Sequence, residues 1–546
     1  MSLRRDVVAV IVGSMLLVPV SGSAAASSPH DHDALGKVDF PVSCSTQAQA
    51  GFDRALALLH HMTYPQAHAA FEQVAATDPE CAMARWGIAM TLFQPLWPTR
   101  PGPEARQAGW AAVQKAKSLH PQADREGLFI AAAEAFFLDP AATDYWVRIR
   151  RWEQAQQKAY EALPQDPEAA VFYALAHLAT TPSDVVDRSH ADRAAAILLK
   201  VYESNPDHPG AMHYLVHAND VPGRERELLE ITRKYERIAP NNPHALHMPT
   251  HIYTRLGDWD RVISGNLRAA DAALAHPAGD QGQYVWDEFP HTLEYLVYAY
   301  LQKGDDQAAA AQLQRLRATE RLEPTFKTAF HLASTQSRYV LERQAWDEAA
   351  RLVPRQPATL DWDRFAWPEA TVQFARGLGA VHIGEAAIAR QAVERLQVLE
   401  SVAAKGGEDL FARSIRILRL ELSAWLAWSQ DEQEASVTLM RQAVELEQST
   451  PKHSVTPGPT LPAGEQLGDL LQAQKRPAEA LAAYQRSLEA YPARFNSLLG
   501  AARAAEASGA TQLSNDFHGR LLQVAGESTR PVLKQIRDAG HLSRSP

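Results

Sequence analysis

Apolar residues recur at helical spacing through most of the chain. In the segment 64–79, Ala67, Phe71 and Val74 are three or four residues apart, which places them on one face of a helix. Runs rich in β-branched residues are scarce, and proline-rich runs such as 95–103 predict irregular loops. The sequence therefore predicts an all-α protein. Further amphipathic helices are expected at 104–118, 123–137, 143–163, 369–404 and 408–448.

One interval in this helical pattern indicates a repeat. His213 and His217 are four residues apart, as are His247 and His251, and the second pair follows the first by 34 residues. This is the period of the tetratricopeptide (TPR) repeat, a helix-turn-helix unit. We therefore predict a TPR-like solenoid whose helix pairs stack into a right-handed superhelix with short, irregular, proline-rich loops.

The repeat register assigns particular side chains to the concave groove. Gly257 is taken as the tight-turn glycine between the two helices of a unit, and the fifth, ninth and thirteenth positions of the first helix then line the groove. In three successive units these positions fall on His213 and His217, then on His247, His251 and Arg255, and then on Glu294 and Tyr298. His291 lies one turn before Glu294, and His60 takes the thirteenth position of the first repeat.

Two imidazole pairs one repeat apart can converge on a small volume. Residues four apart share a helix face, and adjacent helices pack roughly 8–10 Å apart. Imidazoles that reach across this gap can bind copper, iron or zinc, whereas magnesium and calcium prefer oxygen ligands. A single buried histidine is more often a hydrogen-bonded core residue, so the prediction depends on the cluster. The candidate ligands are His213, His217, His247 and His251, with Glu294 or Asp220 as a further group.

The cluster leaves two functions open. The first is a protein whose groove binds a transition metal, with a metal-dependent oxidoreductase as one form of it. The second is a non-enzymatic TPR scaffold that binds a peptide, a partner protein or a small molecule. Arg255 can hold an anionic ligand or a substrate carboxylate. The other groove candidates are His60, Asp220, His291 and Tyr298.

Composition and missing motifs exclude several other classes. The 546 residues exceed one hydrophobic core, so several domains or a long repeat array are expected. The net charge is −10 and basic residues are interspersed with acidic ones, so no nucleic-acid interface is expected. No apolar run beyond the first 20 residues is long enough to span a bilayer. Serine- and cysteine-hydrolase, H-E-x-x-H, phosphate-loop and dinucleotide motifs are missing, so no nucleotide cofactor is expected.

The N-terminus and the cysteines predict export. Arg4 and Arg5 precede the apolar run 7–20, and a cleavage-site-like run of alanines ends at Ala26. Residues 1–26 are therefore expected to be a signal peptide, and the mature protein to be periplasmic or secreted. The two arginines also fit a twin-arginine signal. Cys44 and Cys81 are the only cysteines, and a disulfide is favoured over two metal-binding thiols in an oxidising compartment.

The domain organisation follows from these patterns. The chain is expected to comprise a flexible segment at 27–45, a TPR-like array with a histidine-rich concave centre at 46–449, a proline-rich linker or strap at 450–463, and C-terminal TPR repeats at 464–540.

Several segments together resemble one family. They are C-A-M-A-R-W-G-I-A-M at 81–90, H-Y-L-V-H-A-N-D at 213–220, H-A-L-H-M-P-T-H-I-Y-T-R-L-G-D-W at 244–259, T-P-G-P-T-L-P-A-G-E-Q-L-G-D-L-L at 456–471 and G-A-A-R-A-A at 500–505. This combination resembles exported bacterial TPR-repeat proteins with a histidine-rich central segment, over nearly the whole mature chain. The resemblance implies an all-α superhelical array and no particular activity.

Overall fold

The computed structural model describes residues 34–121, 123–142, 144–279 and 281–538. These residues form α-helices joined by turns, and the same ranges contain no strand, only isolated β-bridges. The predicted TPR-like helical solenoid is confirmed. The expected signal peptide at 1–26 and the first part of the expected flexible segment, 27–33, lie outside the described residues.

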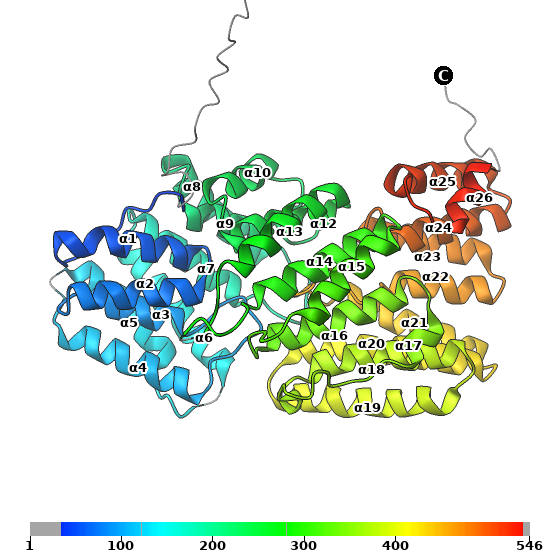
Figure 1. Ribbon diagram of the computed structural model, residues 1–546, viewed down its shortest axis with the longest axis horizontal. Coiled ribbons are helices and arrows are strands. Elements are labelled where there is room, and N and C mark those ends of the chain that lie inside the picture. Colours follow the sequence, from blue (N-terminus) through cyan, green and yellow to red (C-terminus); the bar gives the residue numbers. More distant parts are fainter. Residues whose placement is uncertain (1–33, 122, 143, 280, 539–546) are drawn as a thin grey trace, which may run out of the picture.

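The N-terminal part of the array consists of consecutive helices that pack on their neighbours in the chain (Figure 1). Asp-Pro and Gly-Pro sequences start several of these helices, because proline at the first helical position needs no hydrogen-bond donor. In chain order they are α1 (Thr46–His60), α2 (Tyr64–Thr77), α3 (Ala82–Thr91), α4 (Pro103–Ser118), α5 (Asp124–Phe137), α6 (Tyr145–Ala162), α7 (Pro167–Ala179) and α8 (Ser189–Ser204).

The central part contains a broken helix. Pro249 has no N–H to donate to the carbonyl of Ala245, so the expected single helix divides at Met248 into two. Gly257 ends the second piece with φ of +68°, as the repeat register predicts. The central helices are α9 (Pro209–Asn219), α10 (Leu229–Ile238), α11 (Pro243–His247), α12 (Pro249–Leu256), α13 (Trp259–Leu274), α14 (Glu288–Gln302), α15 (Asp306–Ala318), α16 (Phe326–Leu341) and α17 (Trp346–Ala350).

The C-terminal part continues the same stacking. A short 3₁₀ turn (Trp362–Arg364) precedes it. Its helices are α18 (Ala366–His382), α19 (Ala386–Lys405), α20 (Asp409–Ser429), α21 (Gln433–Gln448), α22 (Ala463–Ala473), α23 (Pro477–Ala490), α24 (Phe495–Ala507), α25 (Thr511–Ala525) and α26 (Pro531–Asp538).

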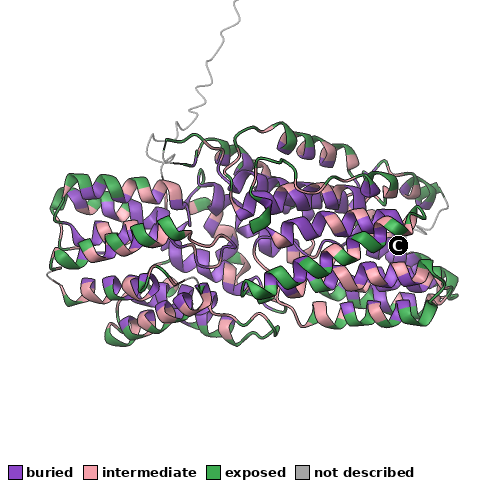
Figure 2. Ribbon diagram, turned by 90° about the horizontal axis from the view of Figure 1, so that it is seen from below, coloured by how far each residue is buried: buried purple, intermediate pink, exposed green. Residues whose placement is uncertain are grey.

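The protein has two large apolar cores. One contains buried residues from Phe40 to Trp286, and the other contains buried residues from Phe326 to Ile536. Smaller clusters from α12 to α15 lie between them, and Figure 2 shows buried residues running through the centre. The central helices are therefore covered by neighbours on both sides.

The array also closes on itself. Trp259 at the start of α13 donates its indole N–H to the carbonyl of Ala493, 2.8 Å away, which brings the α23–α24 turn against the centre. On the other side, Arg100 pairs with Glu408 at 3.0 Å and so joins the α3–α4 loop to the α19–α20 loop. These contacts enclose the concave surface of the central repeats.

Residues 450–462 cross this enclosed surface as an extended strap. Arg338 of α16 holds the strap by donating to the carbonyl of Pro459 at 2.7 Å and to the hydroxyl of Thr456 at 2.9 Å. Lys452 pairs with Asp220, which follows α9, at 2.8 Å. The proline-rich composition suits this extended path, because proline lacks the N–H that a helix needs.

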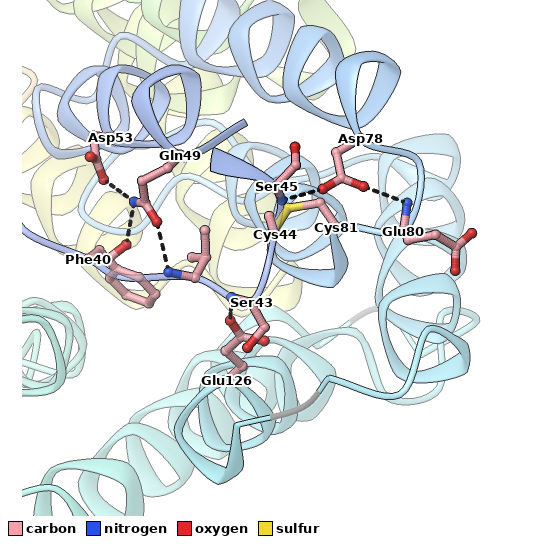
Figure 3. The surroundings of a disulfide bond; sticks show 11 residues. Phe40, Ser43, Cys44, Ser45, Gln49, Asp53, Asp78, Glu80, Cys81 and Glu126 are labelled. Atoms are coloured by element: carbon pink, nitrogen blue, oxygen red, sulfur yellow. Dashed lines mark hydrogen bonds between the residues drawn. A yellow bond between two sulfur atoms is a disulfide. The ribbon is translucent and has the colours of Figure 1, made fainter. Parts of the chain in front are cut away.

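The described part of the N-terminal segment, 34–45, is anchored, which differs from the flexible segment expected there. The N–H of Gly36 donates to the carbonyl of Ile238 at 3.1 Å, and the Phe40 ring is fully buried. A disulfide joins Cys44 to Cys81 at the start of α3 (Figure 3). Hydrogen bonds and a covalent bond therefore fix a segment that its composition predicts to be mobile.

Removing this disulfide is expected to destabilise the protein. The bond spans 37 residues, and opening a loop of that size costs about 3–4 kcal/mol in the chain-entropy account. The free energy of unfolding of the Cys44→Ser/Cys81→Ser variant, measured by urea denaturation, should fall by about that amount. Reductant should destabilise the wild type but leave the variant unchanged. Equal stability of the two proteins would contradict the prediction.

Candidate metal centre

Six histidines gather at the centre of the closed array. They form two groups of three, and within each group one ring nitrogen from each residue lies within 4.8 Å of the others. The first triad is His213 and His217 of α9 with His244 of α11, and the second triad is His247 of α11, His251 of α12 and His291 of α14.

Hydrogen bonds fix the tautomers in the first triad. His213 Nδ1 is 2.6 Å from the carbonyl oxygen of His60, and His244 Nδ1 is 2.9 Å from a carboxylate oxygen of Glu288. Because both partners accept, both Nδ1 atoms carry the hydrogen, and the lone pairs lie on Nε2. Among the described residues, the Nε2 atoms of His213, His217 and His244 have no hydrogen-bond partner. Three buried nitrogens thus lack a partner in one small volume.

The second triad shows the same arrangement. His247 Nδ1 donates to the side-chain oxygen of Asn266 at 2.7 Å, and the Asn266 amide nitrogen donates to a backbone carbonyl, which fixes the amide orientation. His251 Nδ1 donates to Asp220 at 2.9 Å. The Nε2 lone pairs of His247 and His251 then face each other at 2.9 Å. Two neutral imidazoles repel in this geometry unless a cation or a proton lies between them.

The third member, His291, corrects the expectation for Glu294. His291 Nδ1 donates to His331 Nε2 at 2.9 Å, and His331 Nδ1 in turn donates to the Glu294 carboxylate. Glu294 also accepts from Ser334 at 2.6 Å and from Arg338 at 2.8 Å. It is therefore not a member of either triad. Its carboxylate is used by these donors, and through His331 it orients His291.

Burial keeps five of the six imidazoles neutral. It lowers the pKa of His213, His217, His247 and His291 well below the ordinary value of 6.5, and the neighbouring histidines lower it further. The pKa of His251 is also lowered, mainly by burial. Unprotonated nitrogen is the form that binds a metal, so the site is ready for a cation at neutral pH.

The carboxylates that accept from the imidazole Nδ1 atoms are ionised. Burial alone would raise the pKa of Glu288, but Lys327 and His244 hold it well below its usual value. Lys452 and Arg255 have the same effect on the pKa of Asp220, again against burial. A carboxylate that accepts from Nδ1 makes the opposite nitrogen a better metal ligand.

A cavity of about 20 Å³ lies against both triads. This is room for roughly one water-sized ligand. Lys327 reaches it with its ammonium group 3.8 Å from the centre of the Trp97 ring. The residues that line the cavity include His217, His244, His251, His291, Lys327 and Val455 of the strap. A small ligand in this cavity would contact members of both triads.

The remaining candidates from the sequence have other roles. Asp220 and Arg255 lie beside the second triad, where Arg255 donates to the carboxylate and to the carbonyl of Asp220 and thereby supports the partner of His251. Tyr298 lies elsewhere and accepts from Arg494 at 2.9 Å. His60 belongs to a third histidine group, with Glu168 and His208, whose ring nitrogens are all hydrogen-bonded. His60 contacts Glu168 at 2.8 Å and the Tyr214 hydroxyl at 3.2 Å, and His208 contacts Glu168 at 3.1 Å and accepts from the N–H of Ala211 at 3.2 Å.

The histidines are buried rather than exposed in an open groove, and several partners were not predicted. His213 and His247 have no exposed surface, because the closed array and the strap cover them. The spacing of His244 three residues before His247 is a helical signal that predicts a shared face. The unpredicted residues are His244, Asn266, Glu288 and Lys327. Nothing in the local sequence indicates the last three, since they come from distant helices.

Comparisons with known proteins leave the function open. No family model and no curated protein matches the chain. A chain of the crystal structure of the APC/C hetero-tetramer Cut9-Hcn1 is 14% identical, with 90% of each chain covered and a TM-score of 0.34. A monomeric mutant of IFIT1 with Gppp-AAAA is 13% identical, with 81% of this chain and 90% of that chain covered and a TM-score of 0.40. At such TM-scores the likeness carries no inference about ligands or activity.

The metal-free protein is expected to lose stability in mild acid. Unfolded histidines take up protons near pH 6.5, whereas the folded triads resist protonation, so stability is complete above that pH and decreases below it. Each such histidine contributes about 1.4 kcal/mol per pH unit below its unfolded pKa. The thermal unfolding midpoint should be measured in chelator between pH 7.5 and 5. The midpoint should fall less with decreasing pH in His213→Gln than in the wild type. His276→Gln, at a half-buried position, is the control and should behave like the wild type. The same pH dependence of the midpoint in His213→Gln and the wild type would contradict the prediction.

Proposed function

We propose that the protein binds two transition-metal ions, one in each triad, and acts as a metal-dependent oxidoreductase. The observation that carries this proposal is the direction of the imidazole lone pairs. Five of the six rings, all but that of His217, have Nδ1 committed to an acceptor, which leaves the lone pair on Nε2. A set of converging lone pairs is the donor arrangement that a cation requires.

A purely structural role accounts poorly for this arrangement. Buried polar atoms in proteins are nearly always hydrogen-bonded, and leaving one unpaired costs about 1–3 kcal/mol. The third histidine group meets this rule, since Glu168 accepts from both His60 and His208. Within the described residues the first triad does not meet it, because three Nε2 atoms lack a partner. In the second triad the Nε2 atoms of His247 and His251 face each other as two acceptors. A metal ion in each would pair the free nitrogens and remove the repulsion between His247 and His251.

The donor set favours copper. Each triad offers imidazole nitrogens alone, and the nearby carboxylates are engaged with Nδ1 atoms and with cations. Imidazole suits copper, zinc and iron, and copper binds most tightly in the series of divalent ions. Copper also changes charge by one electron, so two adjacent ions can exchange two electrons with one substrate. Zinc in the same sites would have no redox chemistry.

The non-enzymatic TPR scaffold remains the alternative function. The strap occupies part of the inner surface that a bound peptide would use, and Arg338 already binds strap carbonyls. Export by a signal peptide is part of the proposal, and the disulfide between Cys44 and Cys81 suits an oxidising compartment. Within the described ranges, every helix is too short or too polar to cross a membrane.

Metal analysis tests the proposal directly. The purified chain, loaded with copper and desalted, should carry about two ions per chain by mass spectrometry. The variants His244→Ala and His291→Ala should each retain about one ion, because each removes a ligand from a different triad. His382→Ala, which removes a partly buried imidazole stacked on Trp346, is the matched control and should retain both ions. A wild type without bound metal would overturn the proposal and leave the scaffold function.

Asp220→Asn is expected to weaken the second triad selectively. The asparagine amide no longer offers a carboxylate to His251 Nδ1, and loss of such a partner typically lowers metal affinity 10–100-fold. Competition with a chelator should show one weakened ion and one unchanged ion. Asp187→Asn, at an exposed position, is the control. An equal loss of affinity for both ions, or no loss of affinity for either, would contradict the role given to Asp220.

A further inference from the structure

A second and much larger cavity, of about 400 Å³, lies next to the metal centre. Its volume is in the range of pockets that hold one organic molecule. One wall is apolar, formed by Phe330, Trp367, Ile417, Leu418, Leu461 and Leu467. The strap and the residues that follow Asp220 complete the enclosure.

Only the strap separates this pocket from the metal centre. Within the strap, Lys452, His453 and Thr456 line the large pocket. Between them, Ser454 and Val455 line the small cavity against the triads. A molecule in the pocket is therefore separated from the histidines by the thickness of the strap.

The side of the pocket nearest the metal centre carries excess positive charge. Lys452 donates to Asp220 at 2.8 Å and to the carbonyl of Thr456 at 3.2 Å, so one of its three N–H groups is unused. Arg255 donates to Asp220 through Nε and Nη2, and Nη1 donates to none of the described residues. Two cations thus share one carboxylate, that of Asp220. An anionic partner would stabilise this partly buried excess of positive charge.

The pocket's other acidic groups are poorly suited to supply this partner. Asp187 and Glu489 line the pocket at exposed positions, where water already solvates them. Glu225, which also lines the pocket, accepts from the N–H of Gly223 at 2.7 Å. Burial raises the pKa of Glu447 to about 7, so this carboxyl is partly neutral at physiological pH. It also accepts from the N–H of Ala463 at 3.1 Å. The cations beside Asp220 are therefore free to bind an anion from outside the chain.

We propose that this pocket binds an organic anion with an apolar body, whose carboxylate contacts Lys452 and Arg255, and that it is the substrate site of the metal centre. The assignment as substrate site rests on the proposed function. Asp220 links the two sites, because its carboxylate holds both cations and His251 Nδ1. An anion that binds Lys452 and Arg255 weakens their contacts with Asp220 and so changes how strongly Asp220 accepts from His251. Anion binding should therefore alter the environment of a metal ion in the second triad.

The binding part of the proposal is tested on the metal-free protein with 2-naphthoate and its neutral analogue 2-naphthamide. Calorimetry should show naphthoate binding at least tenfold more tightly, because only the carboxylate contacts the two cations. Lys452→Gln should weaken naphthoate about tenfold and leave naphthamide unchanged. Ala490→Trp, at an exposed position lining the pocket, should weaken both ligands, and the exposed Lys405→Gln should weaken neither. Equal affinity for the two ligands, or a Lys452→Gln variant that binds naphthoate like the wild type, would overturn the proposal.

The link to the metals is tested on the copper-loaded protein. Saturating naphthoate should shift its visible absorption and its electron paramagnetic resonance spectrum, and the shift should be lost in Lys452→Gln. If the protein binds naphthoate but does not take up copper, the pocket is upheld, and the proposed function and the substrate assignment are both overturned. If the protein takes up copper but does not bind naphthoate, only the proposal that the pocket binds an organic anion is overturned. Both bindings without a spectral shift would overturn the assignment of this pocket as the substrate site.

Discussion

The central constraint on this structure is the set of hydrogen bonds that commit histidine Nδ1 atoms to acceptors. An imidazole has one donor and one acceptor nitrogen when neutral, so committing Nδ1–H decides where the lone pair lies. Acceptors that surround the cluster, such as Glu288 and Asp220, therefore turn the lone pairs inward. Burial of the rings strengthens this arrangement, because it disfavours the protonated form.

That arrangement depends on the closure of the array. An open superhelix would leave the concave surface in water, where imidazoles could be protonated and hydrated. Here the contact of Trp259 with Ala493 and the pairing of Arg100 with Glu408 bring distant parts of the chain over the centre. The strap then separates the small cavity against the triads from the large pocket. A fold built from repeats thus gains enclosed sites that a regular open array does not have.

The candidate site was only partly predictable. Spacing of four residues within a helix and 34 residues between helices identified His213, His217, His247 and His251, because both intervals are local geometry. The same register placed Glu294 among the ligands, although its carboxylate is engaged by His331 and two other donors. A repeat register predicts which face a residue lies on. It does not predict which neighbour across that face reaches its side chain first.

The sequence by itself determined the helical class, the repeat unit, the turn at Gly257 and the residue types available for a metal site, because all of these depend on local spacing and backbone preference. Only the tertiary structure decided how the histidines divide into two triads and which groups orient them. Glu288 meets His244 across 44 residues and Lys452 meets Asp220 across 232. Such pairings depend on how the superhelix closes, and that closure is the sum of many packing contacts spread over the whole chain.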